Sequence, residues 1–126
     1  MARDECGDRP DAPSILLVED DALVLLDIEM IVRDAGYRYV CTAASAMAAL
    51  RVLESQPVSL AIVDYDLAGG NTQNLLRRLL LAGTRVVILT GFGDDLVLPD
   101  DLRAIPVVAK PFAETAITSL LPNAQE

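Results

Sequence analysis

The stretch Ile15-Leu16-Leu17-Val18-Glu19-Asp20-Asp21 decides the fold, because a continuous apolar run ends abruptly at a group of acids. A short apolar run without alternation is typical of a central strand that is covered on both faces. Residues 22–35 then place apolar side chains near helical spacing, and Gly36 follows as a helix terminator. The first predicted unit is therefore a strand, an acidic turn and a helix.

The same order of strand and helix repeats outward from this unit. We expect further strands at 37–41, 58–63, 85–89 and 107–109, and further helices at 45–54, 73–81 and 112–121. Between residues 91 and 101 the sequence is rich in Gly and Asp, so the fourth helix is expected to be short or irregular. Alternation of this kind predicts an α/β fold, a doubly wound five-stranded parallel sheet with helices on both faces.

Length and composition point to one domain. The chain has 126 residues, of which 52% are hydrophobic, enough for one core and too few for two domains of ordinary size. We expect residues 14–121 to form the domain, 1–13 to be a disordered leader and 122–126 a short tail. This layout leaves no room for an output domain, so we expect a stand-alone protein.

Charge and residue types exclude several functions. The net charge of −9 argues against direct binding of nucleic acid. No histidine is present, which excludes Ser-His-Asp hydrolases and most zinc sites and leaves the chemistry to carboxylates. The apolar runs are far shorter than the roughly 20 residues of a membrane-spanning helix. The N-terminus lacks the apolar core of a secretory signal, so we expect a cytoplasmic protein without membrane insertion.

Polar residues follow four of the predicted strands: Glu19-Asp20, Asp64, Thr90 and Lys110. Each alone has an ordinary explanation as a helix cap, a turn or a solvated loop residue. Together they are expected at one cleft, because the carboxyl ends of the strands meet there in a doubly wound sheet. Three acids so close would repel one another without a divalent cation, and Mg²⁺ suits carboxylate oxygens. An oxygen nucleophile, a metal and further donors are the parts that phosphoryl transfer needs.

Ordered motifs in the chain resemble those of response regulator receiver domains, the phosphoacceptor domains of two-component signalling. The motifs are Leu17-Val18-Glu19-Asp20-Asp21, Leu60-Ala61-Ile62-Val63-Asp64, Ile88-Leu89-Thr90-Gly91 and Val107-Val108-Ala109-Lys110-Pro111-Phe112. They cover the chain from about Ser14 to Leu121. The resemblance implies a flavodoxin-like sheet of strand order 2-1-3-4-5. It also implies that the protein is no enzyme beyond catalysing its own phosphorylation and dephosphorylation.

The resemblance implies a phosphoacceptor and a metal site. Asp64 is the expected phosphoacceptor and also a metal ligand. Asp20 is implied to bind Mg²⁺ or Mn²⁺ directly, and Glu19 to bind it through water. The backbone carbonyl of Asp66 is implied to complete the metal site.

Thr90 and Lys110 are implied to act on the phosphoryl group, Thr90 by a hydrogen bond that shifts on activation and Lys110 by an ion pair. The peptide bond before Pro111 is expected to be cis. The donor would be a sensor histidine kinase or a histidine phosphotransfer protein, since the chain has no histidine of its own. Output would pass to an unidentified protein partner through the surface around the fourth helix, the fifth strand and the last helix. Homodimerisation stays open.

The loop after the fourth strand indicates a subgroup and a candidate switch. Thr90-Gly91-Phe92-Gly93, with the later Lys110-Pro111-Phe112, looks like the FATGUY subgroup of receivers, which is often single-domain. Phe92 stands where that subgroup more usually has tyrosine. Val107 stands where the wider family has a switch aromatic. Phe92, flanked by Gly91 and Gly93, is a candidate replacement, and an aromatic packed onto the core is an equal alternative.

Two other functions stay open. Asp64-Tyr65-Asp66 also fits the Asp-x-Asp start of haloacid-dehalogenase-like phosphatases, although in those enzymes this motif ends the first strand and the acid pair comes late. The second alternative is a phosphorylation-silent receiver that serves as an interaction module. The complete set of acids, threonine and lysine argues against a silent copy.

Overall fold

The computed structural model describes residues 14–122, with the exception of the side chain of Asp94. The predicted leader at 1–13 and residues 123–126 of the predicted tail lie outside this part of the chain. The strands are β1 (Ser14–Val18), β2 (Tyr39–Ala43), β3 (Leu60–Asp64), β4 (Arg85–Thr90) and β5 (Val107–Ala109). The α-helices are α1 (Ala22–Asp34), α2 (Ala46–Ser55), α3 (Thr72–Leu81) and α4 (Glu114–Thr118).

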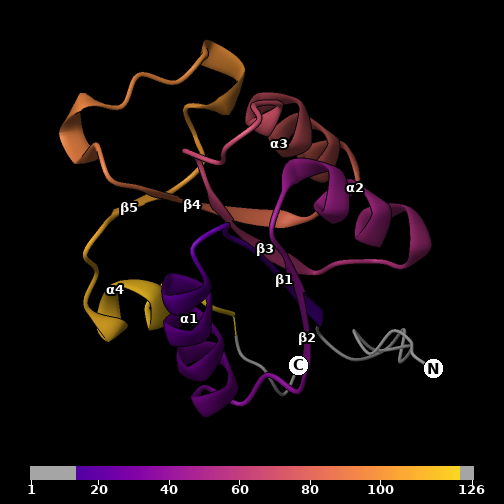
Figure 1. Ribbon diagram of the computed structural model, residues 1–126, viewed down its shortest axis with the longest axis vertical. Coiled ribbons are helices and arrows are strands. Elements are labelled where there is room, and N and C mark those ends of the chain that lie inside the picture. Colours follow the sequence, from indigo (N-terminus) through magenta and orange to yellow (C-terminus); the bar gives the residue numbers. More distant parts are fainter. Residues whose placement is uncertain (1–13, 123–126) are drawn as a thin grey trace.

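The five strands form one parallel sheet in the order β2-β1-β3-β4-β5, which confirms the predicted fold class. Helices α1 and α4 cover one face of the sheet, and α2 and α3 cover the other (Figure 1). Because every strand runs the same way, all the strands' carboxyl ends lie along one edge of the sheet. The polar residues that follow the strands are therefore brought together there.

The central strand β1 supplies side chains to two cores, one on each face of the sheet. Ile15 and Leu17 pack beneath α1 and α4, whereas Leu16 and Val18 pack beneath α2 and α3. All four side chains are at most 1% exposed, which explains why the sequence of this strand is apolar without alternation.

The crossover from β4 to β5 contains no α-helix, as expected from its sequence. It has two short 3-10 turns, η1 (Gly93–Asp95) and η2 (Asp100–Leu102), on the loop at the upper left of Figure 1. Leu98, Leu102 and Ile105 are buried in the core beneath α2 and α3. These buried side chains fix an otherwise irregular segment to the sheet.

Three predicted elements differ from their observed bounds by two residues or more, and the other differences are of one residue. The second strand is Tyr39–Ala43 rather than 37–41, because the chain after α1 first closes a turn in which Tyr37 N–H donates to Val32 O. The third strand begins at Leu60 rather than at residue 58. The last helix is only Glu114–Thr118 rather than 112–121, since the residues after Thr118 form tighter i to i+3 bonds.

Within residues 14–122, the helices are all too short or too polar to cross a membrane.

Candidate functional site

Three carboxylates meet at the carboxyl edge of the sheet. Glu19 and Asp20 directly follow β1, and Asp64 is the last residue of the neighbouring strand β3. One carboxylate oxygen of each lies within 4.8 Å of the other two. Glu19 and Asp64 are buried, whereas Asp20 is exposed. The arrangement is an acidic cleft in which Asp20 is the exposed member.

Lys110, the residue that follows β5, provides a positive charge to this cleft. Its Nζ lies 3.0 Å from Glu19 Oε1 and 3.3 Å from Asp64 Oδ1. Its backbone N–H donates to Thr90 O at 2.8 Å, which continues the pairing of β4 and β5. The bond between Lys110 and Pro111 is cis, as the family resemblance implied. Two acids and a lysine from three separate strand ends thus form one contact group.

Burial dominates the electrostatics of Glu19. Desolvation, together with the neighbouring Asp64, raises the pKa of Glu19 to about 7 against the opposing attraction of Lys110. Desolvation lowers the pKa of Lys110, but its contacts with Glu19 and Asp64 outweigh this and leave that pKa raised. Oε1 of Glu19 is buried and makes no hydrogen bond to the described residues, although Lys110 stands nearby. A buried carboxylate oxygen of this kind is suited to a further cationic or water partner.

Backbone N–H groups hold the carboxylates in place. Asp21 N–H donates to Glu19 Oε2 at 3.1 Å, and Asp66 N–H donates to Asp64 Oδ1 at 3.0 Å. Ala68 N–H donates to Asp20 Oδ2 at 3.0 Å and so connects the loop after β3 to the end of β1. Because one oxygen of each carboxylate is held by a backbone N–H, the direction of the second oxygen is also restricted, which favours a preorganised site.

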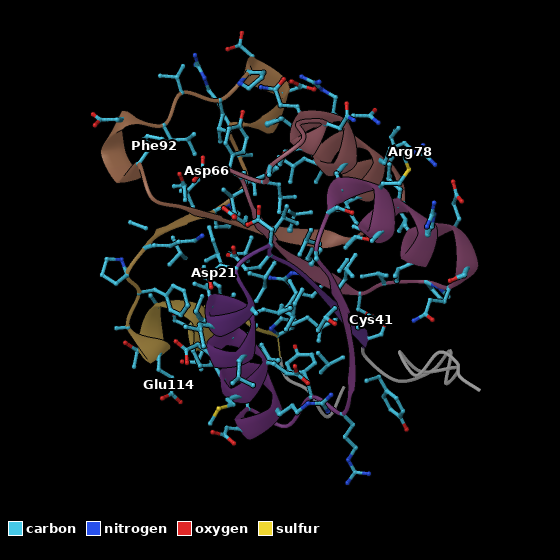
Figure 2. The ribbon with its side chains drawn as sticks, in the orientation of Figure 1. Asp21, Cys41, Asp66, Arg78, Phe92 and Glu114 are labelled. Carbon is cyan, nitrogen blue, oxygen red and sulfur yellow. The ribbon has the colours of Figure 1, made fainter. Side chains whose placement is uncertain are left out.

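Thr90, the fully buried last residue of β4, does not contact the carboxylate of Asp64 through any described bond. Its Oγ1 donates instead to Asp66 Oδ2 at 3.2 Å, and Gly91 N–H donates to the same oxygen at 3.2 Å. Phe92 N–H donates to Thr90 Oγ1 at 3.1 Å. Figure 2 shows Asp66 between the sheet and the loop that carries Phe92. The hydrogen bonds from Thr90 and Gly91 to the carboxylate of Asp66 were not expected from the sequence.

The candidate switch residues lie on the outer side of this group. Phe92 is 61% exposed, so in this structure it does not pack onto the core (Figure 2). Gly91 has open space where a side chain would be. Val107, at the start of β5, is 39% exposed. None of the three touches the carboxylates of Glu19, Asp20 or Asp64 through a described hydrogen bond.

Comparisons with known proteins agree with this geometry. The family model of the response regulator receiver domain matches residues 15–121. The phyllosphere-induced regulator PhyR of Methylorubrum extorquens is 24% identical over 119 residues, which is 90% of this chain and 43% of PhyR. The chain spans less than half the length of the curated relatives that it matches.

Solved structures give the same result. A structure of the PhyR stress response regulator has a TM-score of 0.74 and 26% identity, covering 93% of this chain and 46% of that one. The BeF₃-activated conformation of SdrG from Pseudomonas melonis Fr1 has a TM-score of 0.72 and 29% identity, covering 83% and 89%. Both similarities extend over most of this chain.

Proposed function

The chain belongs to the response regulator receiver domain family of two-component signalling, and from this premise we propose that Asp64 accepts a phosphoryl group from a phosphohistidine. The observation that carries the proposal is the contact of Lys110 Nζ with Asp64 and Glu19, in a cleft that also contains Asp20. Receiver domains are phosphorylated by histidine kinases, and they are not enzymes in the ordinary sense.

The proposed transfer moves one phosphoryl group between two proteins. A carboxylate oxygen of Asp64 attacks the phosphorus of the donor phosphohistidine, and a phosphorus–oxygen bond forms as the phosphorus–nitrogen bond breaks. The electron pair of the broken bond stays on the imidazole nitrogen, which then takes up a proton. Lys110, already 3.3 Å from Asp64 Oδ1, stabilises the negative charge that gathers on the phosphoryl oxygens.

The donor atoms of the cleft fit Mg²⁺ or Mn²⁺. The carboxylates of Glu19, Asp20 and Asp64 converge within 4.8 Å, and among the described residues the buried Glu19 Oε1 has no partner other than Lys110 Nζ at 3.0 Å. We propose that Asp20 and Asp64 hold the ion directly, that Glu19 holds it through water, and that the backbone carbonyl of Asp66 completes the set. A bound divalent cation neutralises charge on phosphoryl oxygens and favours their approach to a carboxylate.

We propose that the donor, a sensor histidine kinase or a histidine phosphotransfer protein, docks beside α1 in the cytoplasm, where kinases find ATP. A hollow of about 310 Å³ next to Lys110 supports this site; it is lined by Val24, Asp27, Lys110, Pro111 and Phe112. The outer face of α1 carries apolar side chains that are more than half exposed, namely Leu23, Leu26 and Met30. Exposed apolar groups beside a phosphorylation site suit a protein partner.

For output, we propose that the receiver signals through a phosphorylation-dependent protein surface. The irregular β4–β5 crossover, β5 and α4 would form this surface, because they adjoin Thr90 and Lys110. The Thr90-Gly91-Phe92-Gly93 motif supports our proposed assignment to the FATGUY subgroup. In this proposal Phe92 is the mobile aromatic and Val107 leaves it room.

Intact-mass analysis tests the phosphoacceptor. The protein is incubated with acetyl phosphate or phosphoramidate in the presence of Mg²⁺ and, separately, in EDTA. We expect a gain of roughly 80 Da, the mass of one phosphoryl group, only with the metal. Asp64→Asn should abolish the gain, and Asp34→Asn, the same change at an exposed acid of α1, should leave it intact.

The outcomes of this test separate the alternatives. Absence of any adduct in the native chain would favour a silent interaction module. Release of many equivalents of phosphate from a phosphate ester would favour the phosphatase. An adduct that persists in Asp64→Asn would move the phosphoacceptor to another residue.

A further inference from the structure

The carboxylate of Asp66 bridges the loop after β3 and the end of β4. Its Oδ2 receives two hydrogen bonds, from Thr90 Oγ1 and from Gly91 N–H, each at 3.2 Å. Its own N–H donates to Asp64 Oδ1 at 3.0 Å, so the same residue is bonded to the phosphoacceptor through its backbone. Asp66 therefore stands between the acceptor and the threonine that is expected to respond to it.

The only hydrogen of the Thr90 hydroxyl is already donated in this arrangement. A hydroxyl group has one hydrogen to donate, and Thr90 Oγ1 gives it to Asp66 while accepting from Phe92 N–H at 3.1 Å. A phosphoryl oxygen on Asp64 can receive this hydrogen only after the bond to Asp66 breaks. The same holds for Gly91 N–H, which has a single hydrogen and the same carboxylate as partner.

Charge works in the same direction. A carboxylate oxygen with two converging donors resembles a phosphoryl oxygen in its hydrogen bonding, so Asp66 occupies the donors that the phosphoryl group would use. A phosphoryl group on Asp64 would bring negative charge close to the carboxylate of Asp66, and like charges repel. Asp66 is exposed, and Gly91 has open space around it, so both have room to move apart.

We infer that Asp66 is a positioning residue that holds Thr90 and Gly91 in the unphosphorylated arrangement and competes with the phosphoryl group for their hydrogens. The inference rests on the proposed phosphorylation of Asp64. On this inference, activation exchanges the acceptor of the Thr90 hydroxyl. The hydroxyl releases the carboxylate of Asp66 and donates to the phosphoryl group on Asp64 instead. The carboxylate thus sets the position of the equilibrium between the inactive and the active arrangement.

The test is a titration with beryllofluoride at saturating Mg²⁺, followed through the amide resonances of Thr90, Gly91 and Phe92. Asp66→Ala removes the competing acceptor and should tighten beryllofluoride binding about three- to tenfold, the range of one net hydrogen bond. Asp66→Asn keeps the shape and removes the charge, so it should fall between the native chain and Asp66→Ala. The matched control is Asp95→Ala, which removes an exposed acid from the same crossover.

A second readout separates competition from a merely structural role. Without ligand, the Gly91 and Phe92 amides of Asp66→Ala should already be displaced toward their positions in the beryllofluoride complex of the native chain. Unchanged affinity in Asp66→Ala, or free-state resonances displaced in an unrelated direction, would overturn the inference while leaving the phosphoacceptor in place. Failure of the native chain to bind beryllofluoride would instead remove the proposed function itself.

Discussion

Arg77 of α3 and Asp101 of η2 form a two-point ion pair that fastens the β4–β5 crossover to the helix. Arg77 Nε lies 2.7 Å from Asp101 Oδ2, and Arg77 Nη2 lies 3.2 Å from Asp101 Oδ1. The pair raises the pKa of the arginine and lowers the pKa of the aspartate, as expected for mutual stabilisation of both charges. Planar two-point geometry is the form in which an exposed pair restrains its partners best.

Arg77→Ala should therefore loosen the crossover more than it destabilises the fold. We expect faster hydrogen exchange at the amide of Leu102, which donates to Pro99 O, with little change in the thermal midpoint, because the ion pair is exposed. Arg103→Ala is the control, since Arg103 pairs with Asp100 within the crossover itself. A large drop in the midpoint for Arg77→Ala would mean that the pair supports the core.

Removal of Lys110 should destabilise the metal-free protein in a pH-dependent way. Lys110→Met leaves buried Glu19 and Asp64 without their cation. At about pH 8, where both acids are charged, the loss should cost up to about 3 kcal/mol. The loss should shrink at about pH 5, where Glu19 is protonated because its pKa is raised. Thermal denaturation in EDTA at the two pH values measures it, and a loss of equal size at both would contradict the ion-pair explanation.

The stabilisation by Mg²⁺ should grow with pH. Because the pKa of Glu19 rises from 4.5 to about 7 on folding, its contribution to stability is present below pH 4.5 and is lost as the pH rises through about 7. Mg²⁺ needs charged carboxylates, so its shift of the thermal midpoint should be larger at about pH 8 than at about pH 6.

Glu19→Gln is the matched variant for this prediction. It keeps the shape of the side chain and removes its titration, so the pH dependence of the Mg²⁺ shift should flatten. Differential scanning fluorimetry with excess Mg²⁺ or EDTA measures the thermal midpoint with and without the ion, and repeating it at about pH 6 and pH 8 gives the pH dependence of the Mg²⁺ shift. An equal Mg²⁺ shift at both pH values in the native chain would show that Glu19 does not titrate in this range.

Tyr37 should make the fold sensitive to alkali. Burial raises the pKa of Tyr37 above 10.0 despite the nearby charge of Arg85, so its contribution to stability is full below about pH 10 and is lost as the pH rises through the folded pKa. Its hydroxyl also donates to Pro122 O at 2.7 Å. Tyr37→Phe should cost about 1 kcal/mol at neutral pH and make the alkaline loss shallower.

Urea titrations at neutral pH and above pH 10 measure this effect. Tyr65→Phe serves as the control, because within residues 14–122 the one hydrogen bond described for its hydroxyl is from the exposed Gln73. If Tyr65→Phe and Tyr37→Phe changed the alkaline slope equally, burial of Tyr37 would not be the cause.

The sequence was sufficient to predict the sheet and the residues at its edge. A buried parallel strand is apolar on both faces, so the apolar run before Glu19 could be recognised as a central strand from its own sequence. The carboxyl edge followed from topology, and the structure brings Glu19, Asp20, Asp64 and Lys110 into one cleft. Family resemblance added the cis bond before Pro111, which no local pattern would have indicated.

What could not be predicted depends on side-chain direction and on turns. The start of β2 was misplaced because Tyr37 is as apolar as a strand residue, yet it belongs to the turn that closes α1. The carboxylate of Asp66 was missed because its partners, Thr90 and Gly91, lie 24 and 25 residues further along the chain. The last helix was overextended because periodicity cannot distinguish an α-helix from the tighter turns that follow Thr118.

The bond between Tyr37 and Pro122 also decides how the protein can be handled. Tyr37 lies just before β2, at the amino edge of the sheet, so Pro122 is held at the edge opposite Asp64. A biotin or a fluorophore attached beside Pro122 would thus lie away from the proposed phosphorylation site and leave that edge facing the solution, which suits surface-based binding assays with candidate kinases.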